Sequence, residues 1–311
     1  MVADPPFDPR RPFTRAEALA AGVTPWQLRG AGYARVYRNV YVSRDVPRTV
    51  ELRARAGLRL APRGTVVSHY TAAALWGGAL TARSEIHVSI PVDETFRVDG
   101  IRTHRDRVVR ASTTRGGVRL TTPEQTFVDL AAELDLVQLV VLGDGLVHRR
   151  HTTPARLVEA SWRRSGSGHC LALRAANLVR DGVDSPPESR LRLLIVLSGL
   201  PEPTVNLILR DPGTGDWLRR FELAYPLLRI AIEYEGRHHR DDAEVWAADI
   251  DRREGLDRNA WRVVQVISSG LFDHPLRTLQ RVDQARVDRG AVPVGTFWDE
   301  WRRYFPGKDV R

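Results

Sequence analysis

Apolar and polar residues alternate at a spacing of two in four segments of the C-terminal part of the chain, which predicts half-buried β-strands. These segments are 204–209, 217–224, 228–235 and 261–268. Residues 186–199 and about 241–258 have helical spacing instead, so the predicted order of elements is αβββαβ. This order is typical of a small mixed sheet with helices packed on it. The Gly, Asp and Pro residues of "DGVDSPP" indicate a boundary, and we expect a separate domain over residues 181–311.

The first 64 residues have the pattern of two short helices followed by a β-hairpin. Thr14 and Glu17 have the spacing of a capping box at the first helix, and Thr24 opens the second helix, "TPWQLRGAG". The segment "YARVYRNVYVS" then predicts two strands with a turn at residues 38–39. We therefore predict a winged helix-turn-helix over residues 1–64, in a protein of the α+β or α/β class.

Helices and strands are mixed between residues 65 and 180. The segment "SHYTAAALWG" predicts a helix capped by Ser68, "EIHVSIPV" predicts a strand, and "TTPEQTFVDLAAEL" predicts a helix opened by Thr122. Two further helices are expected on either side of "SGSG". No metal-ligand or nucleophile spacing is present before residue 150, so we expect His69 to be a packed or hydrogen-bonded side chain rather than a catalytic one.

The segment "RIAIEYEGRHH" at 229–239 places two glutamates on one face of a predicted strand. Successive strand side chains point to opposite faces, so Glu233 and Glu235 share a face with Ala231. One alternative is an edge strand whose charged face meets solvent. The preceding strand carries Glu222, however, and a tight hairpin after "FELAY" would set Glu222 beside the two other glutamates. The sequence therefore predicts three carboxylates at one end of a sheet.

Carboxylates gathered in this way repel one another unless protons or a cation neutralise them. Oxygen-only ligands suit Mg²⁺ or Mn²⁺, and such an ion lowers the pKa of a bound water and stabilises charge on a leaving oxygen. We therefore expect Glu222 and Glu233 to bind Mg²⁺ or Mn²⁺ for phosphodiester hydrolysis. Glu188, in "SPPE", has two open interpretations: an outer ligand of this site, or part of a capping box closed on the Ser185 amide.

The net positive charge of the chain suggests a negatively charged partner. The 311 residues have a net charge of +9 and a pI near 10.4, which favours a polyanion such as nucleic acid. The predicted helix-turn-helix offers four side chains for contacts with DNA, namely Gln27, Arg29, Arg35 and Arg38. The alternative, that these arginines only solvate a small domain, stays open.

Cysteine usage argues against a protein held by disulfides or cysteine-bound zinc, and hydropathy argues against a membrane protein. The single cysteine, Cys170, leaves no intrachain disulfide and no cysteine-rich zinc site, and we expect it in the core. Apolar runs such as "LRLLIVLSGL" are too short and too interrupted to span a bilayer, and no apolar stretch follows the N-terminal charges. We therefore expect a cytoplasmic protein without a membrane partner.

Several N-terminal segments resemble the AbiEi-type antitoxin family, an abortive-infection group with a winged helix-turn-helix at its N-terminus. The similar segments are "FTRAEALAAGVT", "RVYRNVYV", "SHYTAAALWG" and "TTPEQTFVDL", which lie within residues 10–150. The resemblance implies DNA binding and, for residues 65–180, an antitoxin-like α+β and helical region.

The C-terminal segments resemble, in order, those of the PD-(D/E)XK endonuclease superfamily, and more closely its branch related to very-short-patch-repair endonucleases. The similar segments are "PPESRLRLLIVLSGLP", "FELAYP", "RIAIEYEGRHH" and "DIDRREGLDRNAWRVVQV". The resemblance implies that Glu222 and Glu233 bind the metal, that Glu235 is a third acidic group, and that His238 transfers a proton or contacts phosphate. Glu222 stands where the family usually has aspartate, and Glu235 holds the place of its usual lysine.

The sequence suggests roles for four more residues of this region. Arg237 and His239 are alternatives to His238, and Asp249 with Arg253 has the spacing of an ion pair along a helix.

We therefore predict a DNA-binding protein whose restriction-endonuclease-like domain, with a C-terminal helical tail, hydrolyses phosphodiester bonds with Mg²⁺ or Mn²⁺. The alternative function is a catalytically inactive, antitoxin-like transcriptional regulator, with a toxin as a possible partner.

Overall fold

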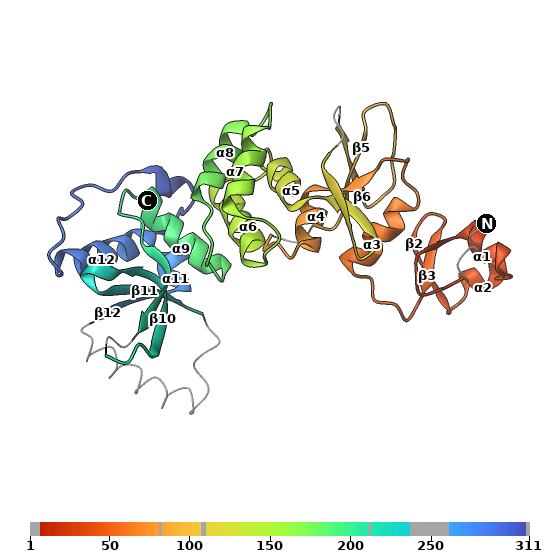
Figure 1. The fold of residues 1–311 in the computed structure, drawn as a ribbon. Helices are drawn as coiled ribbons and strands as arrows, with labels where there is room; N and C mark the ends of the chain where they lie inside the picture. The colour runs from red at the N-terminus through yellow and green to blue at the C-terminus, as the bar shows by residue number, and fades with distance from the viewer. Residues whose placement is uncertain (1–6, 81–82, 107–109, 211–212, 237–260, 309–311) are drawn as a thin grey trace. The chain divides into compact units, whose positions relative to one another are not determined.

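The protein is a mixed α+β chain that folds as two compact units (Figure 1). The computed structural model describes residues 7–80, 83–106, 110–210, 213–236 and 261–308. Unit 1 consists of Met1–Leu134 and Ala155–Leu173, and unit 2 of Asp135–Pro154 and Arg174–Arg311. The segment 135–154, which lies within the predicted region 65–180, therefore belongs to unit 2.

Unit 1 begins with two short helices and a three-stranded sheet of order β1-β3-β2. The elements are β1 (Phe13–Thr14), α1 (Arg15–Ala20), α2 (Pro25–Arg29), β2 (Tyr33–Tyr37) and β3 (Val40–Ser43). Both predicted helix starts are confirmed, because Thr14 with Glu17 and Thr24 with Gln27 form complete capping boxes. The predicted turn between β2 and β3 is confirmed as well, with Asn39 in the left-handed conformation at φ 65°.

The remainder of unit 1 is a five-stranded sheet of order β6-β5-β4-β8-β7 and its associated helices. The strands are β4 (Val66–Val67), β5 (Ile86–Pro91), β6 (Ile101–Asp106), β7 (Ser112–Arg115) and β8 (Val118–Thr121). The helices are α3 (Val50–Leu58), α4 (His69–Leu75), α5 (Pro123–Leu130) and α7 (Pro154–Trp162), and α8 (His169–Leu178) begins in unit 1 and continues into unit 2 from Arg174. The helices predicted after Thr122 and around "SGSG" are therefore confirmed.

One local expectation for unit 1 is confirmed only in part, and another is wrong. Ser68 occupies the N-cap position of α4, but its hydroxyl makes no capping bond. The Ser68 oxygen instead contacts His69 Nδ1 and Ser89 Oγ, each at 2.9 Å, so tertiary partners replace the cap. Cys170 is exposed rather than in the core, because α8 buries its Ala172 and Ala176 positions instead.

Unit 2 contains a four-stranded sheet of order β12-β11-β10-β9. The strands are β9 (Thr204–Arg210), β10 (Trp217–Tyr225), β11 (Ile230–Glu235) and β12 (Arg262–Ile267). β9, β10 and β11 are antiparallel, whereas β11 and β12 are parallel, so the four predicted strands are confirmed. β11 lies between β10 and β12, and the edge-strand alternative is therefore wrong.

The described helices of unit 2 are α6 (Leu136–His148), α9 (Pro186–Leu197), α11 (Ser268–Phe272) and α12 (Pro275–Val287). Two single-turn 3₁₀ helices, η1 (Pro226–Leu228) and η3 (Glu300–Arg303), complete the unit, and η1 forms the predicted tight connection between β10 and β11. The helix predicted at 241–258 lies outside the described residues. Across the described ranges of both units, no helix has the length and apolar character needed to cross a membrane.

A buried arginine holds α9 in unit 2. Arg192 has no exposed surface, and its Nη2 donates to Asp144 Oδ2 of α6 at 3.0 Å and to the Leu178 carbonyl at 2.8 Å. Its Nη1 donates to Glu202 Oε1, also at 3.0 Å. Asp144 in turn accepts from the Arg180 amide at 2.8 Å. This network joins α6, the end of α8, α9 and the connection to β9, which explains why 135–154 packs in unit 2.

Replacing Arg192 tests this network. Arg192→Met should lower the free energy of unfolding by about 3–5 kcal/mol, because it leaves the buried Asp144 carboxylate without its partner. The matched control is Arg262→Met, which removes a half-exposed ion pair with Asp288 and should cost under about 1 kcal/mol. Urea unfolding followed by circular dichroism measures both values. An equal loss of unfolding free energy in the two variants would show that the ion pairs of Arg192 do not hold α9 in place.

Candidate functional site

The start of α9 places the carboxylate of Glu188 near that of Asp184. Ser185 is the N-cap, and its hydroxyl accepts from the Glu188 amide at 3.4 Å. The Glu188 carboxylate, which is buried, accepts from the Asp184 amide at 3.1 Å rather than from the Ser185 amide. The predicted capping box is therefore incomplete, because the Glu188 side chain bonds one residue further back along the chain.

The β10–β11 hairpin supplies the next two carboxylates. Its antiparallel register pairs Leu223 with Ile232, so Glu222, which precedes Leu223 on β10, lies beside Glu233, which follows Ile232 on β11. The Glu222 Oε2 accepts a hydrogen bond from the Tyr234 amide at 2.7 Å. A side-chain carboxylate of β10 thus binds a backbone donor of β11 just past the last paired residues. The predicted position of Glu222 beside Glu233 is confirmed.

Electrostatics shows that these carboxylates affect one another. Burial, and to a smaller extent the charges of Glu188, Glu233 and Asp184, raise the pKa of Glu222 to about 7, against the hydrogen bond from the Tyr234 amide that lowers it. Burial also raises the pKa of Glu188. The structure therefore brings together Glu188, Glu222 and Glu233, which the sequence predicts, and Asp184, which it does not.

Two arginines of β10 neutralise part of this charge. Arg219 Nη2 lies 2.5 Å from Glu233 Oε2, and the Arg220 guanidinium pairs with Asp184. Asp184 also contacts His148 Nδ1 at 3.2 Å. Sequence reasoning missed these residues. Alternation along "WLRRFELAY" was a usable signal for Arg220, which lies two positions before Glu222, but nothing local pointed to His148 on α6.

The other predicted residues of this site divide into two groups. Glu235 is the last residue of β11, half-buried and two positions beyond Glu233, so it lies on the same face of the strand. His238 lies outside the described residues. The same holds for Arg237, His239, Asp249 and Arg253.

The donor set fits a hard divalent cation in its chemistry. It consists of carboxylate oxygens, the ligands of Mg²⁺ and Mn²⁺, and the pKa of Glu222 is raised first by burial and then by the like charges of its neighbours, both of which a bound cation would offset. The carboxylates of Glu188, Glu222, Glu233 and Asp184 do not form a group of three whose ligand atoms all lie within 4.8 Å of one another. Within the described part of the chain, the group of three side chains whose ligand atoms all approach within 4.8 Å is His69, His104 and Glu133 of unit 1.

His69 behaves as the sequence predicts, because it is buried and hydrogen-bonded to Ser68. Burial, and to a smaller extent the positive charge of neighbouring groups, lower the pKa of His69 to about 2. The approach of His104 and Glu133 was not predicted, because no local spacing connects residues that far apart in the chain.

The four predicted DNA contacts lie at the surface of the N-terminal part of unit 1. The Gln27 side-chain oxygen accepts from the Thr24 amide at 2.7 Å, so this oxygen serves the cap of α2. Arg29 is exposed on α2, Arg35 is exposed on β2, and Arg38 is exposed in the hairpin turn. The three arginines therefore present cationic side chains to solvent.

The raised pKa of Glu222 predicts a pH-dependent stability. Between about pH 4.5 and 7 the unfolded chain ionises this carboxyl while the folded chain keeps it protonated, so the wild type should lose up to roughly 3 kcal/mol as the pH rises through this window. Glu222→Gln keeps an oxygen for the Tyr234 amide and removes the charge. Its stability relative to the wild type should therefore increase from pH 5 to pH 8 in urea unfolding; a constant difference would contradict the shifted pKa.

Comparison with known proteins gives relatives without a described function. No protein-family profile matches the chain. Over 268 residues, the chain is 26% identical to an uncharacterised protein of Mycobacterium tuberculosis strain CDC 1551 / Oshkosh, covering 84% of this chain and 96% of that protein. An uncharacterised protein of Mycobacterium tuberculosis strain ATCC 25618 / H37Rv has the same identity and coverage. The chain is thus similar to these two proteins over almost their whole length, and its function has to be inferred from the site itself.

Proposed function

We propose that unit 2 is a divalent-metal-dependent endonuclease domain that hydrolyses phosphodiester bonds in DNA. The observation that carries this proposal is the convergence of Glu188, Glu222, Glu233 and Asp184, which together with burial raises the pKa of Glu222 to about 7. A protein gains no stability from placing like charges so close together. A cation bound by these carboxylates is the function that accounts for the arrangement.

In this proposal Glu222 and Glu233 hold Mg²⁺ or Mn²⁺, and Glu188 supports them as an outer ligand. The ion supplies Lewis acidity, which lowers the pKa of a water and stabilises the leaving oxygen of a phosphodiester. Helix α9 and the four strands support the proposal, because within the described residues they follow the predicted αβββαβ order, whose second helix lies outside those residues. Glu235 and His238 keep their predicted roles as a third acidic group and a proton-transfer or phosphate contact.

Arg219 and Arg220 have a second role in this proposal. Each guanidinium is now paired with a carboxylate, Glu233 and Asp184 respectively. An arginine binds a phosphate with the same bidentate geometry that it uses for a carboxylate. A cation held by Glu233 would leave the Arg219 guanidinium available to a phosphate oxygen of the substrate, whereas Arg220 would reach a phosphate only by leaving Asp184, which is not a proposed ligand.

Cleavage assays test the endonuclease proposal. The full-length protein should cut plasmid and linear DNA with Mg²⁺ or Mn²⁺ and not with a chelator. Glu222→Gln and Glu233→Ala should each lower the rate at least about a hundredfold, because each removes a charged ligand of the ion. Asp216→Asn, which changes an exposed carboxylate in the β9–β10 turn, is the matched control and should cut like the wild type. Cleavage that survives in both site variants would overturn the proposal.

We further propose that the N-terminal part of unit 1 docks the protein on DNA through Arg29, Arg35 and Arg38. These exposed arginines lie on α2 and the β2–β3 hairpin, the elements that a winged helix-turn-helix uses for DNA. The net charge of +9 supports a polyanionic partner.

Removing two arginines tests the docking. The double variant Arg29→Ala with Arg38→Ala should bind duplex DNA more weakly at every salt concentration, and each lost phosphate contact should reduce the salt slope by about 1. Arg63→Ala removes an exposed arginine outside these elements and should bind like the wild type. Fluorescence anisotropy over a salt series measures both quantities. An unchanged slope in the double variant would show that other residues bind DNA.

The second candidate function is a non-catalytic, antitoxin-like regulator. The ion pairs of Arg219 and Arg220 favour it, because they satisfy two carboxylates without a metal. Glu222 in place of the usual aspartate favours it too. Glu222→Asp separates the candidates: if neither the wild type nor this variant cuts DNA, while the wild type binds its own promoter or co-purifies with a toxin, the regulator is supported.

A further inference from the structure

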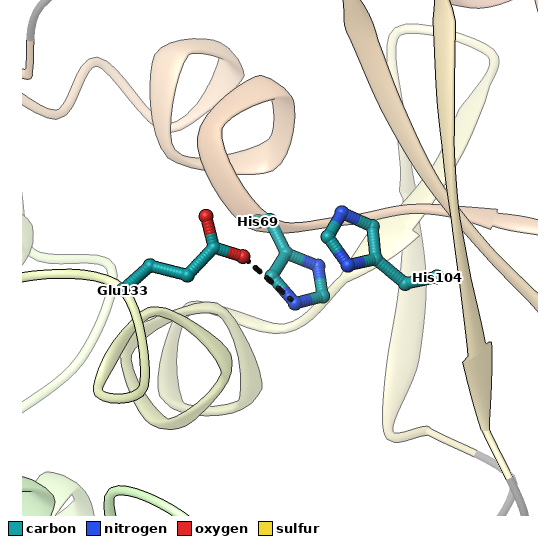
Figure 2. Close-up of side chains that lie close together, drawn as sticks. All are labelled: His69, His104 and Glu133. Carbon is teal, nitrogen blue, oxygen red and sulfur yellow. Dashed lines mark ion pairs between the residues drawn. The ribbon is translucent and has the colours of Figure 1, made fainter.

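Three histidines and a glutamate meet inside unit 1. His69 is the first residue of α4, His87 lies on β5, His104 lies on β6, and Glu133 lies in the turn after α5. His69 Nε2 is 3.8 Å from Glu133 Oε1, as Figure 2 shows. The rings of His69 and His104 are stacked with their centroids 3.6 Å apart. Side chains from three separate segments, 69, 104 and 133, therefore point toward one another.

The hydrogen bonds behind this group orient the rings. His69 Nδ1 contacts Ser68 Oγ at 2.9 Å, and Ser68 Oγ accepts from Ser89 Oγ at 2.9 Å. His104 Nε2 contacts His87 Nδ1 at 3.0 Å. A histidine that binds a metal almost always has its other ring nitrogen held in this way, since that bond sets the tautomer and the ring orientation. Both His69 and His104 have such a supporting partner.

The backbone at His69 adds an independent observation. His69 has a φ of 50°, a left-handed conformation that costs a residue with a side chain roughly 1–2 kcal/mol. Such strain persists only where the surroundings impose it, and it is concentrated at ligand sites. Here it turns the first side chain of α4 toward Glu133, while the Ser68 hydroxyl gives up its capping bond to hold the ring.

We propose that His69, His104 and Glu133 form a binding site for one divalent transition-metal ion, with Zn²⁺ as the fitting ion. Two imidazoles and one carboxylate are a zinc donor set, and they leave a fourth position for water. Tetrahedral ligands of one zinc ion lie about 3.4 Å apart. The 3.8 Å between His69 Nε2 and Glu133 Oε1 is close to this separation, and the ligand atoms of the whole group lie within 4.8 Å of one another, but the stacked rings of His69 and His104 have to rotate before both can bind one ion.

Two features of the surroundings bear on this site. The first feature is exposure: His69 is buried whereas Glu133 is exposed, so an ion can enter from the Glu133 side. The positive charge of Arg110 lies near His69, but its guanidinium pairs with the buried Asp129, which offsets it. Because an ion lies in the plane of each imidazole that binds it, the stack of His69 on His104 opens when the ion binds.

Zinc titration of the full-length protein tests the site. After removal of metals with a chelator, the protein is titrated with Zn²⁺ in competition with a zinc indicator, and Co²⁺ is added separately to record the visible absorption of a tetrahedral site. We expect one tight Zn²⁺ per chain that Glu222→Gln retains. Glu133→Gln and His104→Gln should each weaken it at least about tenfold and abolish the tetrahedral Co²⁺ bands.

Glu94→Gln is the matched control, because Glu94 is an exposed glutamate of the same unit outside the group. It should bind Zn²⁺ like the wild type, and Zn²⁺ should raise the melting temperature of both. If His104→Gln misfolds by near-ultraviolet circular dichroism, Glu133→Gln decides, since its side chain lies in a surface turn. Wild-type affinity in Glu133→Gln, or no zinc binding below micromolar concentrations in the wild type, would overturn the proposal.

Discussion

Unit 2 depends on one buried guanidinium. Arg192 is fully buried on α9 and joins Asp144 of α6, the Leu178 carbonyl and Glu202. Separating a buried charge from its partner leaves the other charge without water or counter-ion, so these elements stay together or unfold together. Glu188 lies one turn before Arg192 on the same helix. The network therefore also sets the place of the first carboxylate relative to the sheet, which makes the candidate site a consequence of the packing of α6 on α9.

The carboxylates of unit 2 are held in a balance between repulsion and pairing. Burial and neighbouring charges raise the pKa of Glu222, while Arg219 and Arg220 neutralise Glu233 and Asp184. Both proposed functions follow from this balance. In an endonuclease a cation held by Glu222 and Glu233 would displace Arg219, whose guanidinium would then face a phosphate, whereas in a regulator the ion pairs are the final state. The two functions therefore differ in whether a divalent cation outcompetes the Arg219 guanidinium for the Glu233 oxygens.

The two units differ in the metal chemistry that their side chains favour. Oxygen donors alone, as at Glu188, Glu222 and Glu233, suit small hard cations. Imidazole with a carboxylate, as in the group of His69, His104 and Glu133, suits zinc. The supporting hydrogen bonds differ as well, because the histidines are oriented by Ser68 and His87, whereas Glu222 is oriented by a backbone amide of the neighbouring strand. The two proposed sites therefore differ in the kind of ion for which each donor set is suited.

The sequence by itself determined the local elements and part of the carboxylate site. Alternation predicted the four strands of unit 2, caps predicted the starts of α1, α2, α5 and α9, and the short hairpin placed Glu222 beside Glu233, because all of these depend on neighbours in the chain. The tertiary structure alone decided that β11 is internal, that Arg219 and Asp184 belong to the site, and that His69 meets His104 and Glu133. These contacts join segments far apart in the chain, and no local pattern of apolar and polar positions encodes which of them pack together.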